Sequence, residues 1–318
     1  MTLYLEHAAL THVGRRANNE DNFCAEPRLG LFAVADGMGG AQAGEVASKL
    51  AASALEGRDS DGLSGLERVD ALIQEANRRV YDRATTDPSA SGMGTTMTVA
   101  LVEGMTVAIG HVGDSRAYLV RGDRMEQLTE DHSLVNELLK SGRLSEEEAQ
   151  VHPQRSVITR AVGTDPDVDV DAFTIEAEEG DVFLICSDGL TDMVEDEDIL
   201  EVLDRHRDDL DKAVRALVAA ANRGGGEDNI TAVAFRVAAG PAADGGSSED
   251  TMTMAAVTAD EPDERTREYQ SDDGESPADE AEPVTAAPVA NPRRVRLVLT
   301  ILVLLAVAGA LLAWGLLR

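Results

Sequence analysis

Cysteine is scarce in this sequence: only Cys24 and Cys186 occur among 318 residues, and both lie in apolar stretches typical of buried strands. Two such thiols give no disulfide framework, so we expect the chain to fold in a reducing compartment. We also expect no N-terminal secretion signal. Residues 1–10 lack a basic start followed by an apolar run, which is what such a signal requires.

Positive charge is the second scarcity. Lysine and arginine total 28 against 59 aspartates and glutamates, a formal net charge of −31, and most of that excess lies in residues 1–237. The lysines are Lys49, Lys140 and Lys212. A surface this acidic repels nucleic acid phosphates, so we predict no DNA or RNA binding.

Charge is absent altogether from residues 297–317, which follow a basic cluster at Arg293, Arg294 and Arg296. An uncharged apolar run of this length predicts a single transmembrane helix, and the arginines predict that everything before it stays on the cytoplasmic side of the cell membrane. Residues 238–296 are rich in small, polar and acidic residues without periodicity. They predict a disordered acidic linker that ends in the basic cluster.

The apolar periodicity of residues 1–237 predicts one α+β domain with a mainly antiparallel β-sandwich. Alternation and short apolar runs predict strands at 3–13, 31–35, 96–102, 106–112, 117–120, 125–128, 173–175, 182–186 and 230–237, with 93–128 as one antiparallel meander and 14–22 as a polar loop. Helical spacing predicts helices at 41–55, 66–84, 197–204 and 209–222. Residues 130–165 carry short helical pieces at 134–139 and 145–150 and predict a flap over a site.

One stretch combines a buried strand with a carboxylate. Residues 31–35 are apolar and end at Asp36, and the glycines that follow leave the carboxylate open to a ligand. An ordinary Asp-Gly turn explains this stretch taken alone. The same pattern, an apolar strand that ends at an aspartate followed by glycine, recurs at residues 184–189. Further acidic residues lie beside asparagines at 19–22 and 227–229. The acids that we expect to share one cation site are Glu20, Asp21, Asp36, Asp114, Asp188 and Asp228.

So many carboxylates cannot stay ionised in one pocket without divalent cations, because like charges raise each other's pKa. Ligands that are all oxygen favour Mg²⁺ or Mn²⁺, and none of the six histidines has a partner at zinc-ligand spacing. Two such ions about 3.5–4 Å apart can turn a bridging water into hydroxide in line with a phosphorus atom. This chemistry predicts a phosphate-ester hydrolase. Arg16 could clamp two phosphate oxygens, although its spacing equally fits a surface arginine.

Seven short motifs occur in an order that resembles one known family. They are Arg16-Ala-Asn-Asn-Glu-Asp21, Ala35-Asp-Gly-Met-Gly-Gly40, Met93-Gly-Thr-Thr96, Gly113-Asp-Ser-Arg116, His152-Pro-Gln-Arg155, Ser187-Asp-Gly-Leu190 and Asp228-Asn-Ile-Thr231. The sequence is similar to bacterial metal-dependent (PPM-type, type-2C) serine/threonine protein phosphatases, and its plan resembles their membrane-anchored members that oppose receptor-like kinases.

The resemblance implies α-β-β-α layers with two Mn²⁺ or Mg²⁺ ions at one end of the sandwich. It implies that Asp36 bridges the ions, that the Gly37 carbonyl binds one of them, and that Asp188 and Asp228 complete the inner shell. Glu20 and Asp21 would act directly or through water, Asp114 would join Asp188 at a third, weaker metal, and Arg16 would hold the substrate phosphate. The implied partners are phosphorylated proteins, among them a Ser/Thr kinase and its targets.

One position departs from the family pattern. Relatives usually carry a histidine where this chain has Ala41, and a lost general acid slows an enzyme by about 10²–10⁴. The main alternative to an enzyme is therefore a catalytically weak, membrane-tethered protein that binds phosphoproteins without turning them over. A metal-dependent nuclease disagrees with the acidic surface. A cysteine-dependent phosphatase needs an arginine six residues after its nucleophile, where Gly30 and Asp192 follow the two cysteines.

Overall fold

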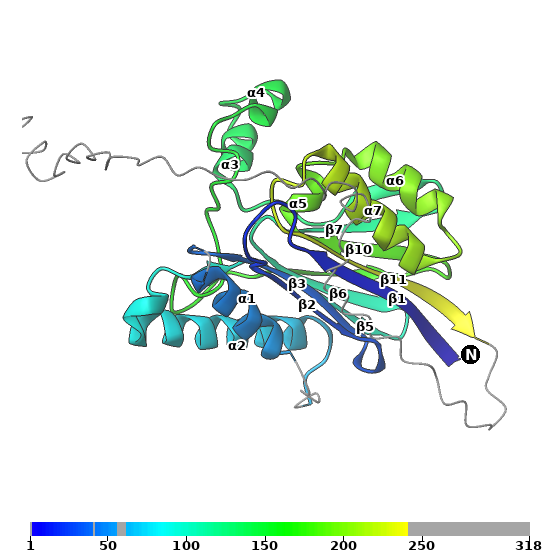
Figure 1. The fold of residues 1–318 in the computed structure, drawn as a ribbon. Helices are drawn as coiled ribbons and strands as arrows, with labels where there is room; N and C mark the ends of the chain where they lie inside the picture. Colours follow the sequence, from blue (N-terminus) through cyan, green and yellow to red (C-terminus); the bar gives the residue numbers. More distant parts are fainter. Residues whose placement is uncertain (1, 41, 56–61, 241–318) are drawn as a thin grey trace, which may run out of the picture. The chain divides into compact units, whose positions relative to one another are not determined.

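The computed structural model describes residues 2–40, 42–55 and 62–240 (Figure 1). The strands are β1 (Thr2–His12), β2 (Asp21–Glu26), β3 (Leu31–Met38), β4 (Gly94–Thr95), β5 (Met97–Glu103), β6 (Thr106–Val112), β7 (Arg116–Arg121), β8 (Arg124–Gln127), β9 (Asp171–Glu176), β10 (Val182–Cys186) and β11 (Ile230–Gly240). The α-helices are α1 (Ala43–Ser53), α2 (Gly65–Thr86), α3 (Leu134–Lys140), α4 (Glu146–Gln150), α5 (Asp188–Thr191), α6 (Asp196–Arg205) and α7 (Leu210–Gly224).

The strands form two sheets in which every pairing is antiparallel. One sheet has the order β1-β11-β10-β7-β8, and the other has the order β2-β3-β5-β6-β9 with β4 added beside β3. The first and last strands of the domain, β1 and β11, pair along their whole length. The predicted antiparallel sandwich is confirmed.

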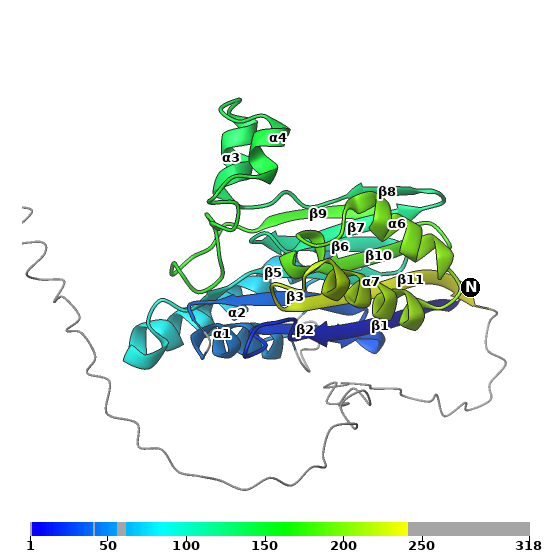
Figure 2. The same cartoon turned by 45° about the horizontal axis from the view of Figure 1, so that its top comes forward.

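Helices cover the outer faces of both sheets (Figures 1 and 2). Helices α1 and α2 pack on β2, β3, β5 and β6, and α7 packs on β1 and β11 with α5 and α6 beside it. A third apolar cluster fills the space between the sheets, where the rings of Phe32, Phe183 and Phe235 stack with centroids 4.3 and 5.0 Å apart. This arrangement has the α-β-β-α layers that the family resemblance implied.

Two sequence predictions need correction. The predicted meander of 93–128 is divided between the sheets, because β5 pairs with β6 while β7 pairs with β8 and β10. The crossing occurs at Gly113, whose positive φ of 112° and close approach to Thr96 exclude a side chain. The predicted loop of 14–22 ends earlier than expected, since Asp21 already pairs in β2.

The predicted flap of 130–165 contains α3 and α4, which lie apart from the two sheets (Figures 1 and 2). Ser145 caps α4 in a reciprocal capping box with Glu148. Ser133 caps α3 by accepting from Asn136 N, so a local cap begins each of the two helices.

Several predictions lie outside the described residues. They are the linker at 238–296 beyond the end of β11, the transmembrane helix at 297–317, and the position of Ala41. Within the ranges that the structure does describe, no helix has the length and apolar character needed to span a membrane.

Candidate active site

Two predicted site aspartates are neighbours across one strand pair. Asp21 opens β2, Asp36 lies near the end of β3, and the register makes them direct partners. Asp36 is fixed through its backbone: its N–H donates to Thr96 Oγ1 at 2.9 Å, and its carbonyl accepts from Thr96 N at 2.8 Å and from Thr95 Oγ1 at 2.7 Å. Both the N–H and the carbonyl of Asp36 are thus fixed by hydrogen bonds within the protein.

The other sheet delivers three further aspartates to the same end of the sandwich. Asp188 follows β10, Asp114 precedes β7, and Asp228 precedes β11. Since β10 lies between β7 and β11, the ends of these strands bring the three carboxylates close together. Asp188 opens the short helix α5, and Gly189 fits there because a Cβ would stand 1.9 Å from the Asn229 carbonyl oxygen.

Asp21 connects the two sheets. Its Oδ2 accepts hydrogen bonds from Ser187 Oγ at 2.8 Å and from Thr231 Oγ1 at 2.6 Å, although both hydroxyls belong to the opposite sheet. The single hydroxyl proton of Thr231 is used by Asp21, so Thr11 Oγ1 must donate to Thr231 Oγ1 across their 2.7 Å contact. We call Ser187 and Thr231 the hydroxyl clasp of Asp21.

The carboxylates at this end of the sandwich raise one another's pKa. The pKa of Asp36 lies well above its ordinary value, first through desolvation and then through the charges of Asp21, Asp188, Asp114 and Asp228. Desolvation also raises the pKa of Asp21 to about 6, against the clasp that lowers it. The cluster therefore holds more negative charge than it can keep ionised by itself near neutral pH.

The charge of Asp114 acts on Asp188 at the strand ends of the second sheet. The pKa of Asp188 is raised by desolvation and then most strongly by Asp114. Desolvation raises the pKa of Asp114 to about 7, with Asp131 as the next cause. Asp114 therefore lies close enough to Asp188 for its charge to raise the pKa of that carboxyl.

The donors fit hard divalent cations. Asp21 Oδ1 and Asp188 Oδ1 are buried and have no hydrogen-bond partner in the described part of the chain, and a buried unpaired carboxylate oxygen requires a cation or a proton. Across residues 2–40, 42–55 and 62–240, no group of three or more His, Cys, Asp or Glu side chains has an arrangement that could hold a metal ion. The carboxylates are neighbours, but their positions in this structure do not form a complete set of metal ligands.

Arg16 and Glu20 lie at the rim of the cluster. The exposed Arg16 donates from Nη2 to Asp228 Oδ2 at 2.5 Å and from Nε to the Glu227 carbonyl at 3.2 Å. The Glu20 carboxylate lies against Gly44, where an added Cβ would stand only 2.0 Å from its Oε2. Its pKa is raised, first by desolvation. Arg16 therefore balances part of the negative charge at this edge.

Gly37 is enclosed by backbone on both sides. An added Cβ would lie 2.2 Å from the Gly44 carbonyl oxygen and 2.6 Å from that of Glu20, and Gly37 N donates to the latter at 3.1 Å. No other residue fits at this position. The structure thus brings all the predicted site residues to one end of the sandwich, in the chain order Arg16, Glu20, Asp21, Asp36, Gly37, Asp114, Asp188 and Asp228.

The residues that form hydrogen bonds to these acids were not predicted from the sequence. Besides the clasp, Asn229 accepts from Glu20 N at 2.7 Å and donates to the carbonyls of Val13 and Asn18. Ser187, Asn229 and Thr231 all fall within the motifs noted above, and each stands next to or near a predicted metal ligand. That proximity is the only sequence signal they offer.

We expect Thr231→Val to weaken the site without changing its shape. The variant keeps the side-chain volume but removes one donor to a buried carboxylate, which costs about 2 kcal/mol of unfolding free energy. Loss of such an outer partner weakens metal binding by roughly 10- to 100-fold. Urea unfolding of the metal-free protein and a Mn²⁺ titration measure the two effects. Thr174→Val on the exposed side of β9 is the control. Equal unfolding free energies and equal Mn²⁺ affinities of the two variants would contradict the role of the clasp.

A two-sheet sandwich covered by helices, with carboxylates from both sheets at one end, is suited to a metal-dependent hydrolase. The family model described as protein phosphatase 2C matches residues 6–230. The chain belongs to this family.

Curated relatives extend the match. The chain is 44% identical over 236 residues to the serine/threonine protein phosphatase PstP of Mycobacterium tuberculosis, covering 73% of this chain but 45% of the relative. It is 41% identical over 225 residues to the serine/threonine phosphatase stp of Listeria innocua, covering 68% of this chain and 89% of that one. The chain therefore spans less than half the length of its mycobacterial relative.

A solved structure is similar along the same region. The catalytic domain of PstP in complex with two manganese ions matches with a TM-score of 0.68 and 40% identity, covering 75% of this chain and all of that one.

Proposed function

We propose that this chain hydrolyses phosphoserine and phosphothreonine in proteins, with two Mn²⁺ or Mg²⁺ ions in the carboxylate cluster. One observation carries the proposal: Asp36 lies within the charge field of four other aspartates that come from both sheets. Family membership and the manganese complex of a related catalytic domain support the same reading. When bound, the ions would supply an activated water and neutralise the charge of the phosphoryl group.

The individual residues take the following parts in this proposal. Asp36 would bridge the two ions, the Gly37 carbonyl would contact one of them, and Asp188 and Asp228 would complete the inner ligands. Glu20 and Asp21 would contribute directly or through water, and Asp114 with Asp188 would hold a third ion. The unpaired buried oxygens of Asp21 and Asp188 support these assignments.

Arg16 would bind the substrate phosphate. Its guanidinium lies at the exposed rim and contacts Asp228, so a phosphate dianion that arrived there would find donors already directed at the cluster. An exposed ion pair of this kind is weak, with a strength of about 0–1 kcal/mol. Arg16 can therefore exchange its carboxylate partner for phosphate oxygens at little cost.

The decisive test is product release. The full chain is incubated with Mn²⁺ and a phosphothreonine peptide, and free phosphate is measured over time. We expect many phosphates released per protein molecule and none after chelation. Stoichiometric peptide binding without release would instead support the phosphoprotein-binding scaffold that Ala41 leaves open, and restoring a histidine at position 41 would show whether that residue limits the rate.

We also propose a single-pass arrangement in the cell membrane. Residues 1–237 would form the catalytic domain on the cytoplasmic side, 238–296 the linker and 297–317 the transmembrane helix, as their composition indicates. A membrane Ser/Thr kinase and its targets would then be natural partners. Recovery of the full chain in the soluble fraction after cell lysis would overturn the anchor.

A further inference from the structure

The 131–160 segment, which carries α3 and α4, is held at its first residue by one arginine. Arg116 donates to Asp131 through Nε at 2.9 and 3.2 Å and through Nη2 at 2.7 Å, so the guanidinium and the carboxylate meet edge to edge. Both side chains are largely buried, with 28% and 17% of their surfaces exposed. A buried two-point pair of this kind fixes direction as well as distance.

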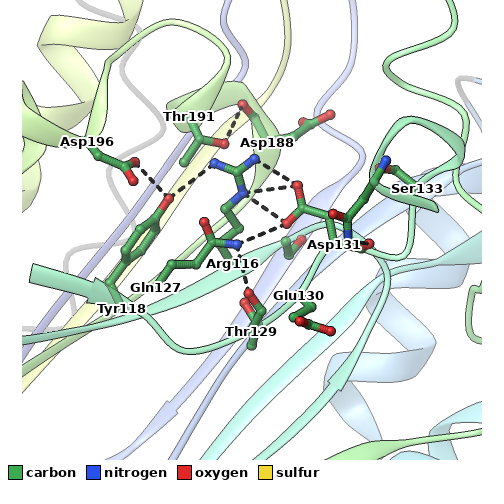
Figure 3. A network of polar contacts seen from close by, with 12 residues as sticks. Arg116, Tyr118, Gln127, Thr129, Glu130, Asp131, Ser133, Asp188, Thr191 and Asp196 are labelled. Atoms are coloured by element: carbon green, nitrogen blue, oxygen red, sulfur yellow. Dashed lines mark hydrogen bonds and ion pairs between the residues drawn. The ribbon is translucent and has the colours of Figure 1, made fainter. Parts of the chain in front are cut away.

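The other side of the guanidinium is also occupied. Its Nη1 donates to the hydroxyl of the buried Tyr118 at 3.3 Å, and that hydroxyl donates to Asp196 Oδ1 at 3.0 Å, at the start of α6. Figure 3 shows Tyr118 and Asp131 on opposite sides of the Arg116 side chain. Arg116 therefore connects the segment to the helix layer of the same sheet.

This anchor lies directly beside the candidate metal ligands. Arg116 is the register partner of Cys186, so it stands two residues after Asp114 and opposite a position two residues before Asp188. The next residue of the segment, His132, is hydrogen-bonded to Gly113, the residue before Asp114. His132 N donates to the Gly113 carbonyl at 2.7 Å, and His132 Nδ1 accepts from Gly113 N at 3.0 Å. The base of the segment is therefore hydrogen-bonded to the turn that precedes Asp114.

The segment also reaches the site farther along its length. Arg155 pairs with Asp192 at 3.2 Å, and Asp192 follows the last residue of α5, the helix that Asp188 opens. The segment thus borders the carboxylate cluster at both its base and this contact. A protein substrate is large enough to contact a segment that borders the cluster, whereas a small phosphate ester need not contact it.

We propose that Arg116 is a positioning residue that sets the placement of the 131–160 segment and so determines how well phosphoproteins, as opposed to small phosphate esters, are accepted. The proposal rests on the phosphatase activity proposed above. Lysine cannot replace this arginine, because a point charge cannot bond both Asp131 oxygens and the Tyr118 hydroxyl together.

The chain supplies a matched control at the other end of the same strand. Arg121, the last residue of β7, forms the same kind of two-point ion pair with Asp181. Its Nε donates to Oδ1 at 2.9 Å and its Nη2 donates to Oδ2 at 2.6 Å. Arg121→Lys breaks an equivalent pair far from the site. Any general cost of losing a two-point pair is therefore common to both variants.

The test compares Arg116→Lys, Asp131→Asn, their double variant and Arg121→Lys in the full chain with Mn²⁺. For the two single variants we expect kcat/KM on a phosphorylated protein to fall about 10- to 100-fold, mainly through KM, with p-nitrophenyl phosphate turnover little changed. The double variant should lose no more than either single one, because both remove the same contact. For Arg121→Lys we expect both kcat/KM on the phosphorylated protein and p-nitrophenyl phosphate turnover to equal those of the unmodified protein.

Amide hydrogen exchange supplies a readout that does not depend on activity. We expect faster exchange in residues 133–160 for Arg116→Lys and Asp131→Asn, and unchanged exchange there for Arg121→Lys. Unchanged exchange in the first two variants, equal losses on both substrates, or the same substrate split in Arg121→Lys would each overturn the proposal. Absence of phosphate release from the unmodified protein would overturn the phosphatase activity instead, while exchange would still test the anchor.

Discussion

Replacing Asp36 with asparagine should lower phosphate release from a phosphothreonine peptide by roughly 10³-fold or more. Asp36 is the carboxylate on which the charges of Asp21, Asp188, Asp114 and Asp228 converge, so its removal takes away the group that would bridge the ions. Two bound cations stabilise a phosphoryl transition state by several kcal/mol, and each 1.36 kcal/mol is a factor of ten in rate. Steady-state phosphate release at saturating Mn²⁺ measures the loss.

The same variant should make the metal-free protein more stable. The buried Asp36 carboxyl must either take up a proton on folding or stay ionised among other carboxylates, and an amide at position 36 avoids both costs, so the urea midpoint in the presence of a chelator should rise. Asp123→Asn in the exposed turn after β7 is the matched control and should change neither quantity. Activity retained by Asp36→Asn would remove the central role of Asp36, and a lower midpoint would contradict the repulsion.

The metal-free protein should lose stability as the pH rises from about 6.5 to about 8.5, by about 3 kcal/mol if two protons are released in part over this range. The pKa of Asp114 is raised to about 7, and those of Asp36 and Asp188 are also raised, in each case first by desolvation. The folded state therefore holds protons that the unfolded chain has already lost. Their contribution is present at low pH and disappears as the pH passes the folded-state values.

The histidines oppose this slope at the lower end of the range. Burial lowers the pKa of His111 to about 4 and also lowers that of His132, so these groups make the protein more stable as the pH rises toward their ordinary value. In the unfolded chain the histidines lose their protons around pH 6.5, so above about pH 7.5 His111 and His132 are nearly neutral in both states and the carboxylates dominate the slope.

Urea unfolding across this range, with a chelator and with saturating Mn²⁺, measures the effect. Bound cations require ionised carboxylates, so Mn²⁺ should abolish or reverse the fall in stability. A flat profile in the presence of the chelator would show that the carboxylates do not share one pocket.

The sequence predicted most elements of the domain because their signals are local. Strand β10 and strand β6 have the predicted bounds, and the helices differ by only a few residues at their ends. The meander was wrong because alternation reveals a strand but does not reveal which sheet it joins. The crossing at Gly113 depends on the contact with Thr96, which no local pattern contains.

The site residues were found from repeated strand-end acids and from motifs, whereas their supports were not. Asp21 receives its two hydrogen bonds from residues 166 and 210 positions away, and Arg16 meets Asp228 across 212 positions. Such partners become neighbours only when the two sheets pack. The same holds for Arg116 and Asp131, whose pairing depends on how residues 127–132 fold back along β7.

The sequence by itself determined that acidic residues end several buried strands and that the surface carries strong negative charge. Both follow from residue type and short-range order. The tertiary structure decided that these acids meet at one end of the sandwich, that hydroxyls of the opposite sheet hold Asp21, and that two carboxylate oxygens stay buried without partners. Packing decides these points, because only the contact between the sheets removes water from the carboxylates, which then require a cation or a proton.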